Sequence, residues 1–321
     1  MASIKKKNVL VTGGAGFIGS HLCDELLEQG AAKVVCVDNF FLGKMENISD
    51  ALQHENFVLY RDDARNFGVL QAIMEKENIE IVFNLATIAL NYSFFNPFDA
   101  YLVNVEIANT LLELLKIGAY KTLIHTSSSE AYGTAQYSPM DENHPTDPTT
   151  PYAAGKAAAD LMVHSFYKVL ELDISIIRPF NNYGPRQNAE GSLAAIIPAT
   201  AKRIQDGGKP IVEGDGEQTR DFIYVKDTVR GIILAYEKEE SRGHIINLGS
   251  GKEVSINHLL QTICDYLNYD GDWEHKPPRT SDVRNLCADS TKARNILEFI
   301  PEIDFANGIA QTLNWYMGEK Y

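Results

Sequence analysis

The chain has 321 residues, of which 45% are hydrophobic, so it can bury a large core and is near the length at which one core divides into two domains. Its formal charge of −14 is spread along the sequence without a basic stripe, which argues against a nucleic-acid partner, and no apolar run is long enough to span a membrane. The four cysteines form no Cys-x-x-Cys pair and the histidines show no metal-binding spacing. We therefore expect reduced thiols, no metal and a cytoplasmic protein.

Short β-branched segments alternate with longer amphipathic segments through the first half of the chain. The predicted strands, buried on both faces, are Asn8–Thr12, Lys33–Asp38, Phe57–Arg61, Ile79–Leu85, Thr122–Thr126 and Ile174–Arg178. Helical periodicity separates them at Gly19–Gln29, Val69–Lys76, Ala100–Gly118 and Pro151–Leu170. This alternation predicts an α/β fold with a Rossmann-type, doubly wound parallel sheet.

A glycine-rich turn, Thr12-Gly13-Gly14-Ala15-Gly16-Phe17-Ile18-Gly19, follows the first predicted strand and opens the first helix. Gly13 permits the tight turn, Gly16 allows the backbone to approach a pyrophosphate, and Gly19 allows close packing of helix on strand. The amides at the start of the helix, where Phe17 and Ile18 lie, would bind the phosphates. In this context the turn predicts a dinucleotide site.

Asp38 ends the second predicted strand about twenty residues after the turn, where a carboxylate can bind the ribose hydroxyls. The same carboxylate repels a 2′-phosphate, and the segment 39–41 that follows offers no arginine, so NAD is favoured over NADP. Asp62 follows the third strand and could reach the adenine; the alternative interpretation is a solvated loop carboxylate.

Tyr152 and Lys156 lie four residues apart at the start of the helix that begins with Pro151, and therefore on one face of it. A tyrosine acts as a base at neutral pH only if its pKa falls by about three units, or roughly 4 kcal/mol, below its ordinary value. The Lys156 ammonium and a nicotinium charge would produce that shift. Ser127-Ser128-Ser129-Glu130 ends an apolar strand, and Ser128 would donate a hydrogen bond to the reacting oxygen.

The pattern changes at about Asn181. Irregular segments rich in glycine and proline occupy Asn182–Gly191, Asp206–Gly216, Asn247–Glu253 and His275–Asp282, and helices are predicted at Ser192–Gln205, Val225–Glu239 and Ile256–Asn268. We therefore expect a cofactor-binding region over residues 1–180 and a smaller mixed substrate-binding region over residues 181–321, with an approximate boundary and interleaved segments. The second region should pack over the strand ends of the first and form a ligand cleft there.

These motifs, together with the segments Arg178–Arg186 (RPFNNYGPR) and Gly214–Phe222 (GDGEQTRDF), resemble the NAD-dependent epimerase/dehydratase family of extended short-chain dehydrogenases over nearly the whole chain. The resemblance implies NAD as cofactor and a nucleotide-diphosphate sugar as substrate, with Tyr152 removing the proton of the sugar C4 hydroxyl. It further implies substrate-binding roles for Asn181 at the diphosphate, for Arg186, and for Arg220 and Arg284 at the phosphates. Surface cations and a turn asparagine are the alternative interpretations.

Glu130 bears on the step that follows C4 oxidation. The run from Ser128 to Gly133 is similar to the GDP-mannose-type dehydratases and also to UDP-glucuronate decarboxylases, whereas dTDP-glucose dehydratases have Asp-Glu at Ser129-Glu130. In a dehydratase Glu130 would take the C5 proton and, with Ser129, assist the departing C6 oxygen. The alternative is that Glu130 merely caps the adjoining loop.

Longer segments, 88–93, 132–137, 141–145 and 178–188, resemble the bacterial N-acetylhexosamine 4,6-dehydratases of the legionaminic type. We therefore expect an NAD-dependent nucleotide-sugar 4,6-dehydratase, a lyase. A UDP-sugar 4-epimerase, a UDP-glucuronate decarboxylase and a non-catalytic NAD-binding relative are the alternatives. Ser128 stands where these dehydratases have threonine. Because this position belongs to the expected sugar pocket, the identity of the sugar is not predicted. The resemblance also implies a homodimer with a four-helix interface built from the helices near 100–118 and 152–170; core packing is the alternative for their apolar faces.

Overall fold

The computed structural model describes residues 2–278 and 283–318. The irregular segment predicted over His275–Asp282 therefore lies partly outside the described residues. Among the described residues, no helix has both the length and the apolar character needed to cross a bilayer.

A seven-stranded sheet forms the centre of the larger region, in the order β10-β6-β5-β4-β1-β2-β3, and every neighbouring pair runs parallel. The strands are β1 (Asn8–Thr12), β2 (Lys33–Asp38), β3 (Phe57–Arg61), β4 (Ile81–Asn84), β5 (Thr122–Thr126), β6 (Asp173–Pro179) and β10 (Ile245–Leu248). Thr12 lies level with Val37 of β2 and with Asn84 of β4, so these strands end at one edge of the sheet. The predicted doubly wound fold is confirmed.

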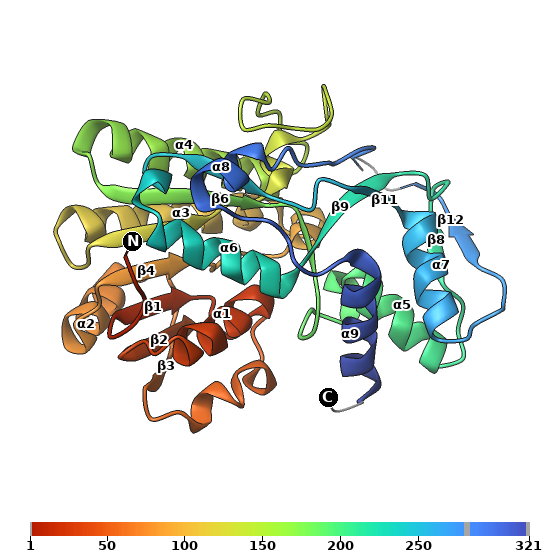
Figure 1. Cartoon of the computed structure of the whole chain (residues 1–321), viewed down its shortest axis with the longest axis horizontal. Coiled ribbons are helices and arrows are strands. Elements are labelled where there is room, and N and C mark those ends of the chain that lie inside the picture. Colours follow the sequence, from red (N-terminus) through yellow and green to blue (C-terminus); the bar gives the residue numbers. More distant parts are fainter. Residues whose placement is uncertain (1, 279–282, 319–321) are drawn as a thin grey trace.

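Helices cover both faces of this sheet (Figure 1). One layer holds α1 (Phe17–Glu28), α6 (Val225–Glu237) and α8 (Thr291–Leu297), and the other holds α2 (Phe67–Glu77), α3 (Pro97–Lys116) and α4 (Pro151–Leu170). Side chains alternate between the two cores along each strand: Val9 and Val11 face the α1 layer, whereas Leu10 faces the α2 layer. A strand buried on both faces needs the continuous apolar run that the sequence shows.

Helix α4 begins at the predicted residue because two local signals coincide there. Pro151 occupies the first turn, where no intrahelical N–H bond is lost, and the Thr150 side chain accepts a hydrogen bond from the Ala153 N–H at 3.2 Å. The helix ends at Leu170, after which Glu171 adopts a left-handed conformation with φ +52°. These limits fix where Tyr152 and Lys156 stand relative to the sheet.

The smaller region lies beyond the strand ends, at the right of Figure 1. It contains a three-stranded sheet, β11-β9-β7, and a parallel pair, β12-β8. Its strands are β7 (Asn181–Tyr183), β8 (Ile211–Glu213), β9 (Thr219–Tyr224), β11 (Glu253–Ser255) and β12 (Glu274–Lys276), and its helices are α5 (Ile196–Gln205), α7 (Ile256–Tyr266) and α9 (Phe305–Met317). Single-turn helices η1 to η6 lie at Met45–Ile48, Ala51–Gln53, Leu90–Phe94, Ser129–Tyr132, Gly191–Leu193 and Glu239–Ser241. Residues 225–248 return to the large sheet as α6 and β10.

The predicted helix Ser192–Gln205 is wrong at its start. Ala194 and Ala195 are extended, with ψ of 140° and 153°, so that η5 ends at Leu193 and α5 begins at Ile196. The predicted loop Asp206–Gly216 contains the short strand β8, which pairs with β12 from a distant part of the chain. The second error arises because tertiary pairing overrides a weak local signal, whereas at the first the Ala195 N–H donates to the nearby Asn188 carbonyl oxygen.

Candidate active site

A cavity of about 700 Å³ opens at the carboxyl edge of the large sheet, between the two regions. It is lined by most of the residues predicted for the site: Gly13, Gly16, Phe17, Ile18, Gly19, Asp38, Asp62, Ser128, Ser129, Glu130, Tyr152, Lys156, Asn181 and Arg186. A cleft where a second region covers the strand ends is the common place for a ligand in such sheets. Residues from across the sequence thus meet in one site.

The glycine turn is built by close backbone contacts. Gly13 has φ +70°, and a Cβ added at Gly19 would lie 2.1 Å from the Gly13 carbonyl oxygen, so neither position tolerates a side chain. Gly16 precedes α1 and no side chain caps that helix. The first-turn amides, with the positive end of the helix dipole, therefore face the cavity and can bind a phosphate.

Asp38 is held at the end of β2 by main-chain donors. Its Oδ2 accepts from the Ala15 N–H at 2.9 Å and its Oδ1 from the Phe40 N–H at 2.8 Å. Burial raises the pKa of Asp38, and these amide bonds act against that rise. The carboxylate lines the cavity at the place where the predicted ribose contact requires an acceptor.

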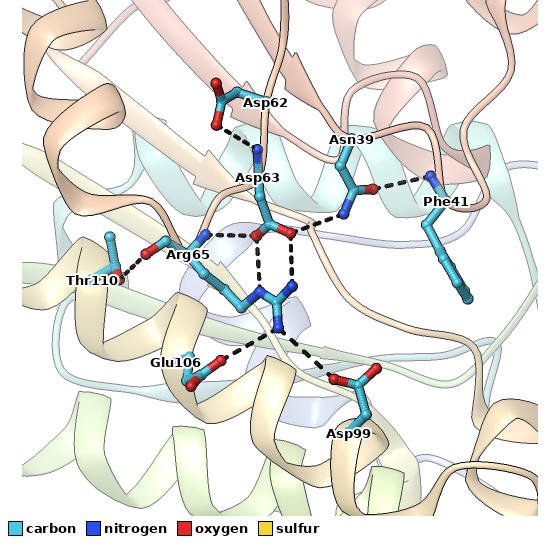
Figure 2. Close-up of polar contacts among 8 residues, drawn as sticks. All are labelled: Asn39, Phe41, Asp62, Asp63, Arg65, Asp99, Glu106 and Thr110. Atoms are coloured by element: carbon cyan, nitrogen blue, oxygen red, sulfur yellow. Dashed lines mark hydrogen bonds and ion pairs between the residues drawn. The ribbon is translucent and has the colours of Figure 1, made fainter.

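An ion cluster that the sequence did not predict lies at this end of the cavity (Figure 2). Asp63 accepts from Arg65 Nε at 3.0 Å and Nη2 at 2.9 Å, and from Asn39 Nδ2 at 3.1 Å. Arg65 also pairs with Asp99 and Glu106 of α3, at 3.8 and 3.5 Å. Three carboxylates around one guanidinium leave no net positive charge for a 2′-phosphate, which fits NAD rather than NADP.

Asp62, predicted to reach the adenine, lines the cavity beside this cluster, and its Oδ1 accepts from the N–H of Asp63 at 2.8 Å. The two carboxylates are adjacent in sequence but point to different partners, as Figure 2 shows. The cluster depends on charges from α3, more than thirty residues away in the chain, so no local signal could have revealed it.

Tyr152 stands at the first turn of α4 with 9% of its surface exposed. Its backbone N–H donates to Ser93 Oγ at 3.0 Å, which ties the loop after β4 to the start of this helix. Burial raises the pKa of Tyr152 to about 12, while side-chain hydrogen bonds with Ser128 and Thr87 lower it and the Glu130 charge raises it. Ser128 therefore lies within hydrogen-bond reach of the phenol, and Glu130 lines the same cavity.

Lys156 lies one turn further along the same face of α4, and only 3% of it is exposed. Its Nζ donates to the carbonyl oxygen of Thr126 at 2.9 Å, at the end of β5. Burial lowers the pKa of Lys156 to about 8, and the negative charge of Asp160 opposes that shift. The ammonium is thus fixed between helix and strand, beside the tyrosine.

The segment after β5 forms the single-turn helix η4. Ser128 caps it, because its Oγ accepts from the Glu130 N–H at 3.3 Å. Ser129 is buried and Glu130 is partly exposed to the cavity. Ser128 thus caps η4, and whether the Glu130 carboxylate also caps the adjoining loop stays open as the alternative.

The four predicted substrate residues are not all brought together. Asn181 lines the cavity, and its Oδ1 is buried without a hydrogen-bond partner among the described residues. Arg186 also lines it and pairs with Asp24 at 2.6 Å. Arg220 donates to the carbonyl oxygens of Thr219 and Val283, and Arg284 pairs with Asp215 at 2.8 Å; neither is among the residues that line the cavity in the described structure.

Two aromatic residues near the end of the chain also reach the cavity without having been predicted. Trp315 and Tyr316 of α9 line it, and the Tyr316 hydroxyl donates to the carbonyl oxygen of Gln187. No motif surrounds them, so the sequence offers no signal for their placement.

Over the described residues, no group of three or more His, Cys, Asp or Glu side chains is arranged to hold a metal ion.

Comparison with known proteins adds the following. Residues 10–312 match the family model described as GDP-mannose 4,6 dehydratase. The chain is 34% identical over 314 residues to a UDP-glucose 4-epimerase of Mycolicibacterium smegmatis, covering 97% of this chain and 99% of that protein.

Two solved structures are also similar. One is a UDP-N-acetylglucosamine 4-epimerase from Methanobrevibacter ruminantium M1 in complex with UDP-N-acetylmuramic acid, with a TM-score of 0.91, 35% identity, and coverage of 98% of this chain and 100% of that one. The other is a dTDP-glucose 4,6-dehydratase from Streptomyces venezuelae with NAD bound, with a TM-score of 0.91, 29% identity and 97% coverage of both chains.

Proposed function

The chain belongs to the GDP-mannose 4,6 dehydratase family of NAD-dependent epimerases and dehydratases, within the extended short-chain dehydrogenases, and we propose that it is a nucleotide-sugar 4,6-dehydratase. The family predicted from the motifs is confirmed. NAD is the cofactor, and the glycine turn, Asp38 and Lys156 are the residues that would hold it. When bound, NAD supplies the hydride acceptor for C4 of the sugar. The proposed substrate is a nucleotide-diphosphate sugar, such as an N-acetylhexosamine derivative.

The oxidation uses the side chains grouped at the end of β5. Tyr152 removes the proton of the C4 hydroxyl, and Ser128 donates a hydrogen bond to the same oxygen. The pKa of Tyr152 is about 12 in its buried setting, so it must fall before the phenol acts as a base. The positive charge of Lys156 and that of the nicotinamide ring stabilise the phenolate and supply this shift. The product is a 4-keto sugar with an acidified C5 proton.

The proposed second step depends on the position of Glu130 in the cavity. Glu130 lines the same cavity as Tyr152, and its charge raises the pKa of Tyr152, so the proposed base shares its cavity with a second ionisable group. Glu130 takes the C5 proton, and the C6 hydroxyl leaves as water with a proton passed from Glu130 and with Ser129 close to the departing oxygen. Bound NAD would supply the same hydride to C6, so that it would not be consumed. A 4-epimerase has no need of this carboxylate.

The described cavity lining disfavours a uronic acid, whose carboxylate needs a cation. The cationic residues that line it are Lys44, Arg65, Lys156 and Arg186. Lys44 pairs with Glu190 at 3.5 Å, Arg65 and Arg186 pair with acidic side chains, and Lys156 faces the Thr126 carbonyl. This arrangement supports a neutral hexose over the substrate of a decarboxylase.

A 4-epimerase is the second candidate, because the relatives with 34% and 35% identity carry that name. Its chemistry requires Ser128, Tyr152 and Lys156, all of which are in place, and re-reduction of C4 from the other face. The two reactions separate at Glu130.

Substitution of Glu130 tests this division. In E130Q we expect the C4 oxidation to persist, seen as nicotinamide reduction by absorbance in a single turnover, while water elimination falls on the order of 100-fold or more. Y152F should lose both steps. E55Q is the matched control, because Glu55 is exposed in the loop that enters β3, at the opposite edge of the sheet. Full turnover by E130Q would transfer the assignment to the epimerase.

We also infer a homodimer through α3 and α4. These helices pack against each other and expose large apolar side chains, among them Phe98 (75% exposed), Leu161 (70%) and Val169 (77%). Exposed apolar side chains gathered on neighbouring helices are typical of a protein interface. Light scattering at micromolar concentration should give a dimer mass, and L161E should lower it; a monomer mass for the unmodified chain would refute the dimer.

A further inference from the structure

A buried ion pair lies directly behind the proposed catalytic residues. Asp160 of α4 is 2% exposed, and its Oδ2 accepts from Arg178 Nη2 at 2.5 Å and from Ser127 Oγ at 2.6 Å. Arg178, on β6, is equally buried, and its guanidinium lies over the Tyr132 ring at 4.3 Å from the ring centroid. Neither charge lines the cavity. Burying a charge costs free energy even when it is paired, so a pair in this position calls for an explanation beyond stability.

The spacing of α4 connects this pair to the site. Tyr152, Lys156 and Asp160 follow one another at intervals of four residues, and all three are buried on the face of α4 turned to the sheet. Lys156 donates to the carbonyl oxygen of Thr126, and the next residue, Ser127, donates to Asp160. Two adjacent residues at the end of β5 are therefore fixed by two successive turns of α4. The next residue is Ser128, which caps the η4 helix.

The ionisable groups around Asp160 come from several elements. Arg178 on β6 and His125 on β5 face it directly, Lys156 and Tyr152 of α4 interact with its charge, and Tyr132 of η4 stacks on Arg178. His125 Nε2 lies 3.8 Å from Asp160 Oδ1, and burial lowers the pKa of His125 to about 4, so it is neutral at physiological pH. Asp160 is thus the buried anion that balances the two cations, Lys156 and Arg178.

We propose that Asp160 is a positioning residue: through Ser127 and Arg178 it fixes the end of β5, and with Arg178 it sets the charge balance that keeps Lys156 an ammonium ion beside Tyr152. The inference rests on the proposed function in one respect, that Lys156 and Tyr152 act as a catalytic pair. Asp160 itself does not touch substrate or cofactor. Loss of its charge leaves two buried cations, Lys156 and Arg178, without a buried anion between them, which favours the neutral amine of Lys156.

Titration of Lys156 by NMR, on protein with ¹³C-labelled lysine and with K156R to assign the signal, tests the charge balance without any substrate. Wild type should titrate near pH 8, in line with the buried site. D160N should move this titration to lower pH and R178M to higher pH, by about one unit each, because they change the local charge in opposite directions. The double variant should return it close to the wild-type value and, lacking an unpaired buried charge, should fold even where a single variant does not.

The matched control is D227N. Asp227 is also 2% exposed and pairs with an arginine, Arg230, at 3.0 Å, but it lies on α6 away from the site. D227N should destabilise the fold while leaving both the Lys156 titration and the turnover rate at neutral pH unchanged. If D160N and D227N give the same Lys156 titration, or if D160N and R178M shift it in the same direction, the charge role is refuted.

Turnover supplies the second readout. In D160N the alkaline limb of the pH–kcat profile should move to lower pH together with the pKa of Lys156, and kcat at pH 8 should fall about fivefold with KM nearly unchanged. S127A removes a hydrogen bond to Asp160 without altering charge, so it should lower kcat several-fold and leave the titration in place. An S127A enzyme with wild-type kcat would overturn the positioning role. If Y152F proves active, the proposed function fails, whereas the Lys156 titration still reports on Asp160.

Discussion

The cofactor side and the substrate side of the cavity are held by different kinds of contact. Around the glycine turn of the cofactor side the main chain fixes the geometry: Gly13 and Gly19 are in backbone contact, and Asp38 accepts from two amides. On the substrate side, side chains reach across long sequence separations, as when Arg186 pairs with Asp24 and Tyr316 donates to the Gln187 carbonyl. The contrast implies that a local sequence pattern suffices to build the glycine turn of the cofactor side, whereas the substrate side depends on tertiary contacts.

The largest expected effect is on the cofactor side. G19A places a Cβ 2.1 Å from the Gly13 carbonyl oxygen, which forces the turn open, so NAD affinity should fall on the order of 100-fold or more. Calorimetric titration of protein freed of NAD measures this change. G68A is the control, because a Cβ at Gly68 of α2 meets no atom within 4 Å. NAD affinity that is equal in both variants would show that the turn is not a rigid cradle.

The second expected effect is a loss of folding stability at acid pH. It involves His21, which contacts the substrate side. Burial lowers the pKa of His21 and of His125 to about 4, and His21 Nε2 lies 3.0 Å from the Pro185 carbonyl oxygen of the substrate region. The unfolded chain binds these protons below about pH 6.5 and the native chain does not, so stability falls as pH drops from 6.5 towards 4. Urea unfolding should show a loss on the order of 2 kcal/mol or more across this range. H125N should weaken the dependence, and an unchanged slope in that variant would contradict the assignment.

A smaller effect is expected for Asn181 on the substrate side. Its buried Oδ1 has no partner among the described residues, so a ligand group is the natural donor to it. N181A should raise KM for the sugar nucleotide about tenfold and leave NAD affinity within error. R284M should raise KM far less, since Arg284 pairs with Asp215 outside the cavity. A larger effect of R284M would mean that this arginine moves into the site when substrate binds.

The smallest effect should come from Ser93, which accepts from the Tyr152 N–H. S93A leaves a buried amide unpaired at the start of α4, so kcat should fall about threefold to fivefold by displacing the tyrosine, with NAD binding unaltered. S165A is the control, because Ser165 is an exposed residue of the same helix that bonds only to Met162 within it. Equal kcat for the two variants would separate Ser93 from catalysis.

The same contrast explains what could be predicted from the sequence. Strands β1, β2, β3 and β5 have the predicted bounds, because each has a short apolar or β-branched core ended by a polar residue. β10 was not predicted, since four residues give little signal and its partner β6 lies some seventy residues earlier. In the site, the glycine turn and the Tyr152–Lys156 spacing are local patterns and were predicted; the Arg65 cluster, Ser93 and Trp315 depend on tertiary contacts and were not.

The substrate arginines show the limit of a motif most clearly. Arg220 lies in a segment that resembles the family, yet in this structure its guanidinium donates to two backbone carbonyl oxygens, at 2.7 and 2.6 Å. A sequence pattern reports the residue type but not the contacts that compete for it. Its predicted role at the phosphates stays a prediction that substrate-bound measurements can address.

Mass spectrometry of products from a panel of UDP-, GDP-, CDP- and dTDP-sugars, including N-acetylhexosamines and uronic acids, tests the central proposal most directly. The account predicts that a neutral sugar nucleotide loses one water with no net reduction of NAD, and that E130Q forms no such product. A product of unchanged mass with inverted C4, formed equally by E130Q, would contradict the dehydratase and establish the epimerase. Loss of carbon dioxide from a uronic acid would contradict both the neutral substrate and the role of Glu130.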